Sequence, residues 1–146
     1  MIHFYKNNED LQPLPHAEVL FQHLKNKGIK VALNTGFTQV ITNAILQKLN
    51  WHNNPLIDYV ISSDEVAEGR PYPYMIIKIQ NELSVADGEQ VVKVGDTEVD
   101  ILEGRNAGCG KVISVTTGAY TRAQLSTYQP DHIIDSLEEV PAILNL

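Results

Sequence analysis

VVKVGDTEVDILEGRNAG, residues 91–108, is the stretch that decides the fold. Its first four residues, 91–94, predict a short buried strand, because strands of parallel sheets are near-continuous apolar runs. The run ends at a glycine, and apolar residues then recur at helical spacing. Asp96 is therefore expected at the carboxyl end of a strand, and Asp100 on the first turn of the following helix.

These two aspartates have a functional and a structural interpretation. Ligands of an open α/β sheet bind at the carboxyl ends of its strands. Two carboxylates at that edge suit a hard cation such as Mg2+. However, Thr97-x-x-Asp100 also fits a helix capping box, which needs no ligand. Residues elsewhere in the chain have to decide between the two.

The rest of the chain alternates between helical and strand patterns. A chain of 146 residues is long enough for one domain with a sizeable core. The alternation predicts an α/β fold, a three-layer doubly wound parallel sheet with helices on both faces. Further helices are expected over 15–27, 38–49 and 73–83 and after the caps Thr121-x-x-Gln124 and Ser136-x-x-Glu139, and further strands over 29–33, 59–62, 111–116 and 133–134.

Composition restricts the possible partners and the compartment. The formal net charge of -7 argues against a nucleic acid or an anionic membrane surface as partner. No apolar run approaches the roughly 20 residues that span a bilayer. The single cysteine, Cys109, excludes an internal disulfide, so we expect a cytoplasmic location and a packing role for this thiol.

Three segments place polar groups at predicted strand ends or in loops close to them. Thr35 and Gly36 follow one strand, and a threonine hydroxyl with free N–H groups at a helix start forms a small anion site. Arg70, in a loop, can bind phosphate through paired hydrogen bonds. Asp96 and Asp100 can bring a divalent ion. Each has a structural alternative (a cap or a solvated loop charge), but together they predict a phosphate site.

Three motifs resemble those of a known family. VALNTGF (31–37), EGRPYPYMI (68–76) and VGDTEVDILEGRNAGC (94–109) are similar to three of the four motifs of the haloacid dehalogenase superfamily, in the wording of its phosphonatase-like branch. The resemblance covers the chain from about residue 14 onward. It implies that residues 1–12 are a remnant of the linker from the cap domain to the core, and that 13–146 form the core domain.

The resemblance also implies roles for individual residues. Thr35 would hydrogen-bond the transferring phosphoryl group, helped by the Gly36 amide. Arg70 would stabilise the charge of that group and orient the nucleophile. Asp96 would be a ligand of the Mg2+ cofactor, and Asp100 would hold the metal site through that ligand or a bound water. The reaction implied is attack by an aspartate on phosphorus, in a small phosphorylated or phosphonate metabolite, followed by hydrolysis.

The first motif of the family, DxDxT on an N-terminal strand, does not occur in this sequence. The chain thus resembles the C-terminal two-thirds of such a hydrolase, without the nucleophile strand between strands 29–33 and 91–94. Each unpaired buried backbone group costs about 1–3 kcal/mol. We therefore expect the two strands to pair directly, residues 2–5 to insert, or another chain to supply a strand by homo-oligomerisation or strand exchange; the first two are favoured.

Two functions from different classes follow. The chain is a truncated form, inactive alone, of a Mg2+-dependent phosphohydrolase, or it is a non-catalytic module that binds phosphate or a partner. A receiver-like signalling domain is a weaker third interpretation, because residues 69–75, GRPYPYM, have no role in it.

Overall fold

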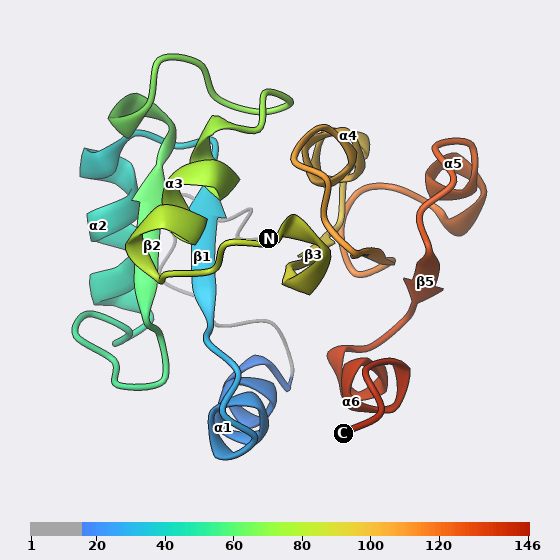
Figure 1. Cartoon of the computed structure of the whole chain (residues 1–146), viewed down its shortest axis with the longest axis horizontal. Helices are drawn as coiled ribbons and strands as arrows, with labels where there is room; N and C mark the ends of the chain where they lie inside the picture. The colour runs from blue at the N-terminus through green and yellow to red at the C-terminus, as the bar shows by residue number, and fades with distance from the viewer. Residues whose placement is uncertain (1–15) are drawn as a thin grey trace.

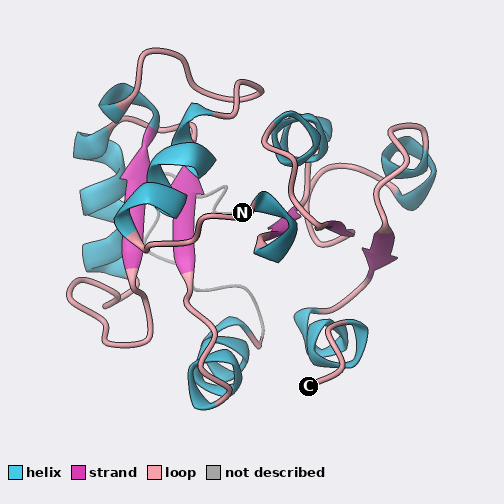
Figure 2. Ribbon diagram, in the orientation of Figure 1, coloured by secondary structure: helices cyan, strands magenta, loops and turns pink. Residues whose placement is uncertain are grey.

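The computed structural model describes residues 16–146, in which helices and strands alternate as the sequence predicts (Figures 1 and 2). Three single-turn 3-10 helices, η1 to η3, lie between the main elements. The elements are α1 (Ala17–Asn26), β1 (Ala32–Thr35), α2 (Gln39–Lys48), β2 (Tyr59–Ser62), η1 (Ser63–Glu65), α3 (Tyr74–Glu82), η2 (Gly88–Gln90), β3 (Val92–Gly95), α4 (Glu98–Asn106), β4 (Lys111–Val115), α5 (Arg122–Ser126), β5 (His132–Ile134), η3 (Leu137–Glu139) and α6 (Val140–Ile143).

The first strand begins later than predicted, because the preceding residues close helix α1. Gly28 adopts a φ of 76°, which residues with a Cβ rarely tolerate. This lets the Ile29 N–H donate to the Leu24 carbonyl at 2.9 Å and the Gly28 N–H to the Lys25 carbonyl at 3.0 Å. These are the bonds of a Schellman-type C-cap. The strand predicted over 29–33 therefore runs from Ala32 to Thr35.

The strands form two parallel sheets with helices on both faces. β1 pairs with β2, and β3, β4 and β5 pair in that order. On one face, helices α1, α2 and α6 contribute to the larger apolar core, which includes Leu20, Ile45 and Val140. On the other, α3, α4 and α5 contribute to a second core around Ile76, Ile101 and Leu125. This is the expected three-layer α/β architecture.

Direct pairing of the strands that flank the missing one, which we favoured, is wrong: β1 pairs only with β2 and β3 only with β4 among the described residues. A cavity of about 650 Å3 lies between them, lined by residues of both strands. One contact crosses it near the carboxyl ends of the strands, where Lys93 Nζ donates to Asn34 Oδ1 at 2.8 Å. We call this cavity the slot; residues 2–5 lie outside the described part of the chain.

Candidate phosphate and metal site

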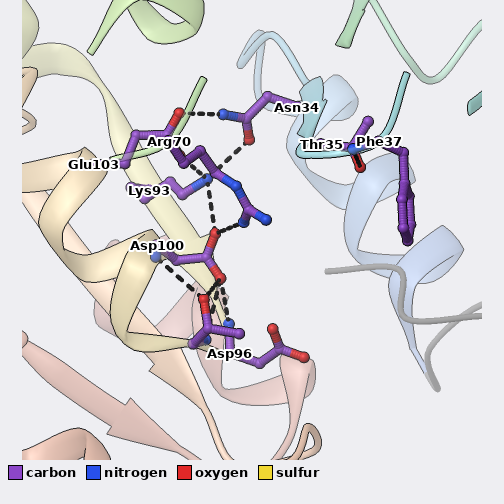
Figure 3. Close-up of polar contacts among 9 residues, drawn as sticks. Asn34, Thr35, Phe37, Arg70, Lys93, Asp96, Asp100 and Glu103 are labelled. Atoms are coloured by element: carbon purple, nitrogen blue, oxygen red, sulfur yellow. Dashed lines mark hydrogen bonds and ion pairs between the residues drawn. The ribbon is translucent and has the colours of Figure 1, made fainter. Parts of the chain in front are cut away.

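Arg70 and Asp100 form the centre of the candidate site (Figure 3). Arg70 Nη1 donates to Asp100 Oδ1 at 2.6 Å, and the Asp100 side chain is only 2% exposed. Gly36 makes room for the guanidinium, because a Cβ added there would lie 2.9 Å from Arg70 Nη2. The Arg70 Nε is buried and has no hydrogen-bond partner within residues 16–146. A buried donor without a partner is unfavourable, and a bound anion could satisfy it.

Asp100 organises the start of helix α4. Its Oδ2 accepts from the N–H groups of Asp96 and Thr97, at 3.0 and 3.1 Å, and from the Thr97 hydroxyl at 3.0 Å. The Asp100 N–H in turn donates to Thr97 Oγ1, which completes the capping box that the sequence predicts. Burial raises the pKa of Asp100, but the cations of Lys93 and Arg70 outweigh it and hold the pKa well below the usual range. Asp100 is therefore a carboxylate at neutral pH, and both its oxygens are engaged.

Asp96 follows β3 directly and is 1% exposed. Its side chain lies against the loop after β4, where a Cβ added to Gly118 would overlap Asp96 Oδ2 and lie 2.7 Å from its Cγ. The glycine thus sets the place of this carboxylate. Asp96 also lines the slot.

Thr35 and Gly36 lie at the carboxyl end of β1, on the opposite wall of the slot from Asp96. Thr35 Oγ1 accepts from the Phe37 N–H at 3.1 Å, which tightens the turn after β1. Thr35 lines the slot together with Asp96. Arg70 lies between the two walls, next to Gly36 on one side and bonded to Asp100 on the other. The structure thus brings the predicted site residues together at one end of the slot.

A buried polar network beside the site is absent from the sequence-based prediction. Lys93 Nζ contacts Asn34 Oδ1 at 2.8 Å, Glu103 Oε1 at 2.9 Å and Asp100 Oδ1 at 3.4 Å. Asn34 Nδ2 donates to Glu103 Oε2 at 2.7 Å, which closes a ring of three side chains across the slot (Figure 3). The signal available in the sequence is the lysine within the apolar run 91–94, because an unpaired lysine is almost never buried.

Other polar residues serve the fold. Asp58, just before β2, accepts from the Val31 N–H at 2.7 Å and pairs with Lys25 at 2.6 Å. Asp64 accepts from the Gln39 N–H at 3.0 Å. Cys109 is buried, and burial raises the pKa of its thiol to about 11. This agrees with the packing role predicted for Cys109.

The described residues fit a partial magnesium site. Across residues 16–146 no three His, Cys, Asp or Glu side chains are arranged to hold a metal. Mg2+, however, usually keeps several waters and takes only one or two protein carboxylates. Asp96, at the end of β3, could supply one such carboxylate, and Asp100 holds the Asp96 backbone in place.

The fold is a doubly wound α/β sheet with a partly buried arginine and two buried carboxylates at the carboxyl edge of its strands. The family model for haloacid dehalogenase-like hydrolases matches residues 2–108. The chain belongs to this family, and the relatives below identify its phosphonatase-like branch, as the sequence motifs predict.

The individual relatives are longer proteins. The chain is 31% identical to phosphonoacetaldehyde hydrolase of Vibrio cholerae, over 90% of this chain and 57% of the relative. It is 28% identical to phosphonoacetaldehyde hydrolase of Bordetella pertussis, over 91% of this chain and 56% of the relative. The crystal structure of a phosphonoacetaldehyde hydrolase-like protein from Oleispira antarctica superposes with a TM-score of 0.80 at 23% identity, covering 90% of this chain and 55% of that one. The chain thus spans little more than half the length of these relatives.

No helix within residues 16–146 has the length and apolar character needed to cross a bilayer.

Proposed function

We propose that this chain is the phosphate- and metal-binding core of a Mg2+-dependent phosphohydrolase that acts on a small phosphorylated or phosphonate metabolite. The single observation that carries the proposal is Arg70, whose buried Nε has no partner within the described residues while its Nη1 is bonded to Asp100. A phosphate oxygen beside Thr35 and Gly36 would satisfy that donor. The names of the relatives support the same class of substrate.

In this proposal each residue has a defined task. The Arg70 fork binds two oxygens of the phosphoryl group and offsets their charge. The Thr35 hydroxyl, already placed by the Phe37 N–H, orients a third oxygen. Asp100 holds the Arg70 guanidinium in place. It also accepts from the Asp96 N–H and so positions the end of β3, which carries the candidate metal ligand Asp96. When bound, Mg2+ would supply further charge stabilisation for the phosphoryl oxygens.

The alternative function is a non-catalytic module that binds phosphate without turnover. The observation that favours it is the sequence itself, in which no D-x-D-x-T motif occurs. A chain that keeps the binding groups but lacks the nucleophile retains binding and loses most of the rate enhancement. We therefore expect the 146-residue protein alone to bind phosphate without appreciable phosphatase activity.

Calorimetric titration with inorganic phosphate, with and without Mg2+, tests the proposal. Arg70→Met is expected to weaken phosphate binding at least about tenfold, since hydrogen bonds to charged groups contribute about 1.5–3 kcal/mol each. Arg70→Lys keeps the positive charge, so it should lose less phosphate affinity than Arg70→Met. The matched control is Arg105→Met, because Arg105 pairs with Asp131 on the surface. Asp96→Asn should remove the effect of Mg2+.

The same titration and an enzymatic assay distinguish the outcomes. The phosphate site would be refuted if Arg70→Met and Arg105→Met lost phosphate affinity equally while circular dichroism showed both variants to be folded. Hydrolysis of a generic phosphate ester by the pure chain, abolished by Asp96→Asn, would refute the non-catalytic alternative.

A further inference from the structure

Asn34 is a buried amide in β1, directly before Thr35. Asparagine is uncommon in strands, and the buried strands of parallel sheets are mostly apolar. Asn34 is only 7% exposed, so its amide group would be costly to bury without hydrogen bonds. Both ends of the amide are used: Oδ1 accepts from Lys93 Nζ at 2.8 Å, and Nδ2 donates to Glu103 Oε2 at 2.7 Å. The residue therefore ties the end of β1 to two other elements, β3 and α4.

The two partners of Asn34 are themselves held in place. Glu103 is fully buried in α4, Lys93 is 6% exposed in β3, and their charged groups lie 2.9 Å apart. Hydrogen bonds to charged groups are shorter and stronger than those between neutral groups. Because each bond of the Asn34 amide has a charged and buried partner, the amide is held in one orientation and in one place.

The same two partners flank Asp100, which holds Arg70. Lys93 Nζ lies 3.4 Å from Asp100 Oδ1. Glu103 comes three residues after Asp100, so both acids lie on one face of α4. Arg70 Nη1 donates to Asp100 Oδ1 at 2.6 Å. Asn34 is thus connected, through its partners, to the acid that positions the guanidinium (Figure 3).

This connection sets the separation of the two halves of the candidate phosphate site. Thr35 and Gly36 directly follow Asn34 in the chain. The other half is Arg70, held by Asp100. A hydrogen bond is lost when its donor and acceptor separate by much more than about 3.2 Å. One tetrahedral anion can therefore contact both halves only while their separation is kept, and a site held in its binding geometry before the ligand arrives binds more tightly.

We propose that Asn34 is a positioning residue for the phosphate site. Its paired bonds to β3 and α4 keep Thr35 at the separation from Arg70 at which one phosphate contacts both. This inference deepens the proposed function and rests on it. The alternative is that Asn34 only satisfies the buried charges of Lys93 and Glu103. In that case its replacement lowers stability but leaves the phosphate affinity of the folded protein unchanged.

The first test is calorimetric titration of the 146-residue protein with inorganic phosphate in the presence of Mg2+. Asn34→Leu is similar in size, removes both bonds and leaves the Lys93–Glu103 pair in place. Phosphate affinity should fall at least about tenfold, the loss expected when one hydrogen bond to a charged group is no longer aligned. The matched control is Asp58→Leu, which removes two polar contacts near the opposite, amino end of β1. It should change phosphate affinity less than about twofold, because distant sites act independently.

An exchange of amide and carboxylate tests whether the bonds carry the effect. Asn34→Asp alone places two carboxylates against each other, and Glu103→Gln alone leaves two amides where an amide and a carboxylate met. Asn34→Asp/Glu103→Gln restores one of each with unchanged net charge, so a donor again faces an acceptor and Lys93 keeps an oxygen from both side chains. Phosphate affinity should fall at least about tenfold in Asn34→Asp and recover to within about twofold of the parent protein in the exchange variant.

A double-mutant cycle tests which group Asn34 acts through. Thr35→Val keeps the shape of the side chain and removes its hydroxyl. In the Thr35→Val protein, Asn34→Leu should lower phosphate affinity by less than about threefold, because the two changes then remove the same contact.

Four results would overturn the inference while the proposed function stands. These are parent-like phosphate affinity in Asn34→Leu where Arg70→Met has lost it, equal loss in Asp58→Leu, no recovery in a folded exchange variant, and independent losses in the cycle with Thr35→Val. If circular dichroism shows Asn34→Leu to be unfolded, the comparison of Asn34→Asp with the exchange variant decides. A parent protein that binds no phosphate, or an Arg70→Met variant that binds it equally well, refutes the phosphate site itself.

Discussion

Replacing Lys93 by methionine should destabilise the protein strongly, because this change leaves a buried charge without its partner. The Lys93 side chain is 7% exposed and contacts Glu103, which is fully buried, at 2.9 Å. Methionine keeps the length and apolar stem of lysine but removes the ammonium. Asp100 retains its bond to Arg70, whereas among residues 16–146 Glu103 retains only the amide of Asn34.

The expected magnitude follows from this difference. Removing one partner of a buried ion pair costs about 3–5 kcal/mol, which is a large part of the 5–15 kcal/mol that stabilises a typical domain. Glu103→Gln alone should cost less, about 1–3 kcal/mol, because Lys93 keeps Asn34 and Asp100 as partners. The double variant Lys93→Met/Glu103→Gln should be more stable than Lys93→Met, since no unpaired carboxylate is left beside residue 93.

Urea unfolding followed by circular dichroism measures these differences. With a slope of about 1–3 kcal/mol per molar urea, Lys93→Met should lower the midpoint by roughly 2 M. Lys111→Met, at the half-buried start of β4, is the control for losing a lysine from a strand. The reasoning fails if the free energy of unfolding of Lys93→Met lies within about 1 kcal/mol of that of the parent protein. It also fails if the loss of unfolding free energy in the double variant equals the sum of the losses in the two single variants. The error of such additivity comparisons is roughly 0.3–0.5 kcal/mol.

Three further predictions address the site and the thiol. Gly118→Ala should displace the Asp96 carboxylate and weaken Mg2+ binding by calorimetry, with the fold unchanged by circular dichroism; unchanged Mg2+ affinity would contradict the placement of Asp96. The lowered pKa of Asp100 means that its carboxylate stabilises the fold above the ordinary aspartate pKa of 3.8, and that this contribution is lost as the pH falls below that value. The free energy of unfolding of Asp100→Asn should therefore decline less toward acid pH than that of the parent protein. Because burial raises the pKa of Cys109 to about 11, a disulfide reagent at pH 8 should modify it only once urea unfolds the protein; fast reaction in buffer would show an accessible thiolate.

The order and type of the elements were predictable because local signals agree with the packing. The capping boxes predicted at Thr121 and Ser136 form, although the second begins a 3-10 turn that leads into the four-residue helix α6. The start of β1 was missed because Ile29 is apolar and has strand character, yet its N–H closes α1. The periodicity of apolar side chains does not reveal a backbone hydrogen bond of this kind.

The placement of the candidate site residues at one edge of the sheet was predictable, but their connections were not. Residues that follow a strand directly, such as Thr35 and Asp96, can be assigned to the carboxyl edge from sequence order alone. The network of Asn34, Lys93 and Glu103 joins residues up to 69 positions apart in the chain. Only the tertiary arrangement of β1, β3 and α4 brings them together. The same holds for the slot, since periodicity does not say which strands become neighbours.

The two halves of the slot differ in chemistry, and this difference explains why its carboxyl end keeps the shape of a site. There, Asn34 and Lys93 bond directly across the gap, and Arg70 spans it between Gly36 and Asp100. Asn34, Lys93 and Asp100 are almost fully removed from water, so each needs its partner. Widening the gap at this end would therefore cost several kcal/mol. Toward the amino end, apolar side chains line the gap. Apolar contact fixes no geometry by itself, so the polar end is the part that holds Thr35 opposite Asp96.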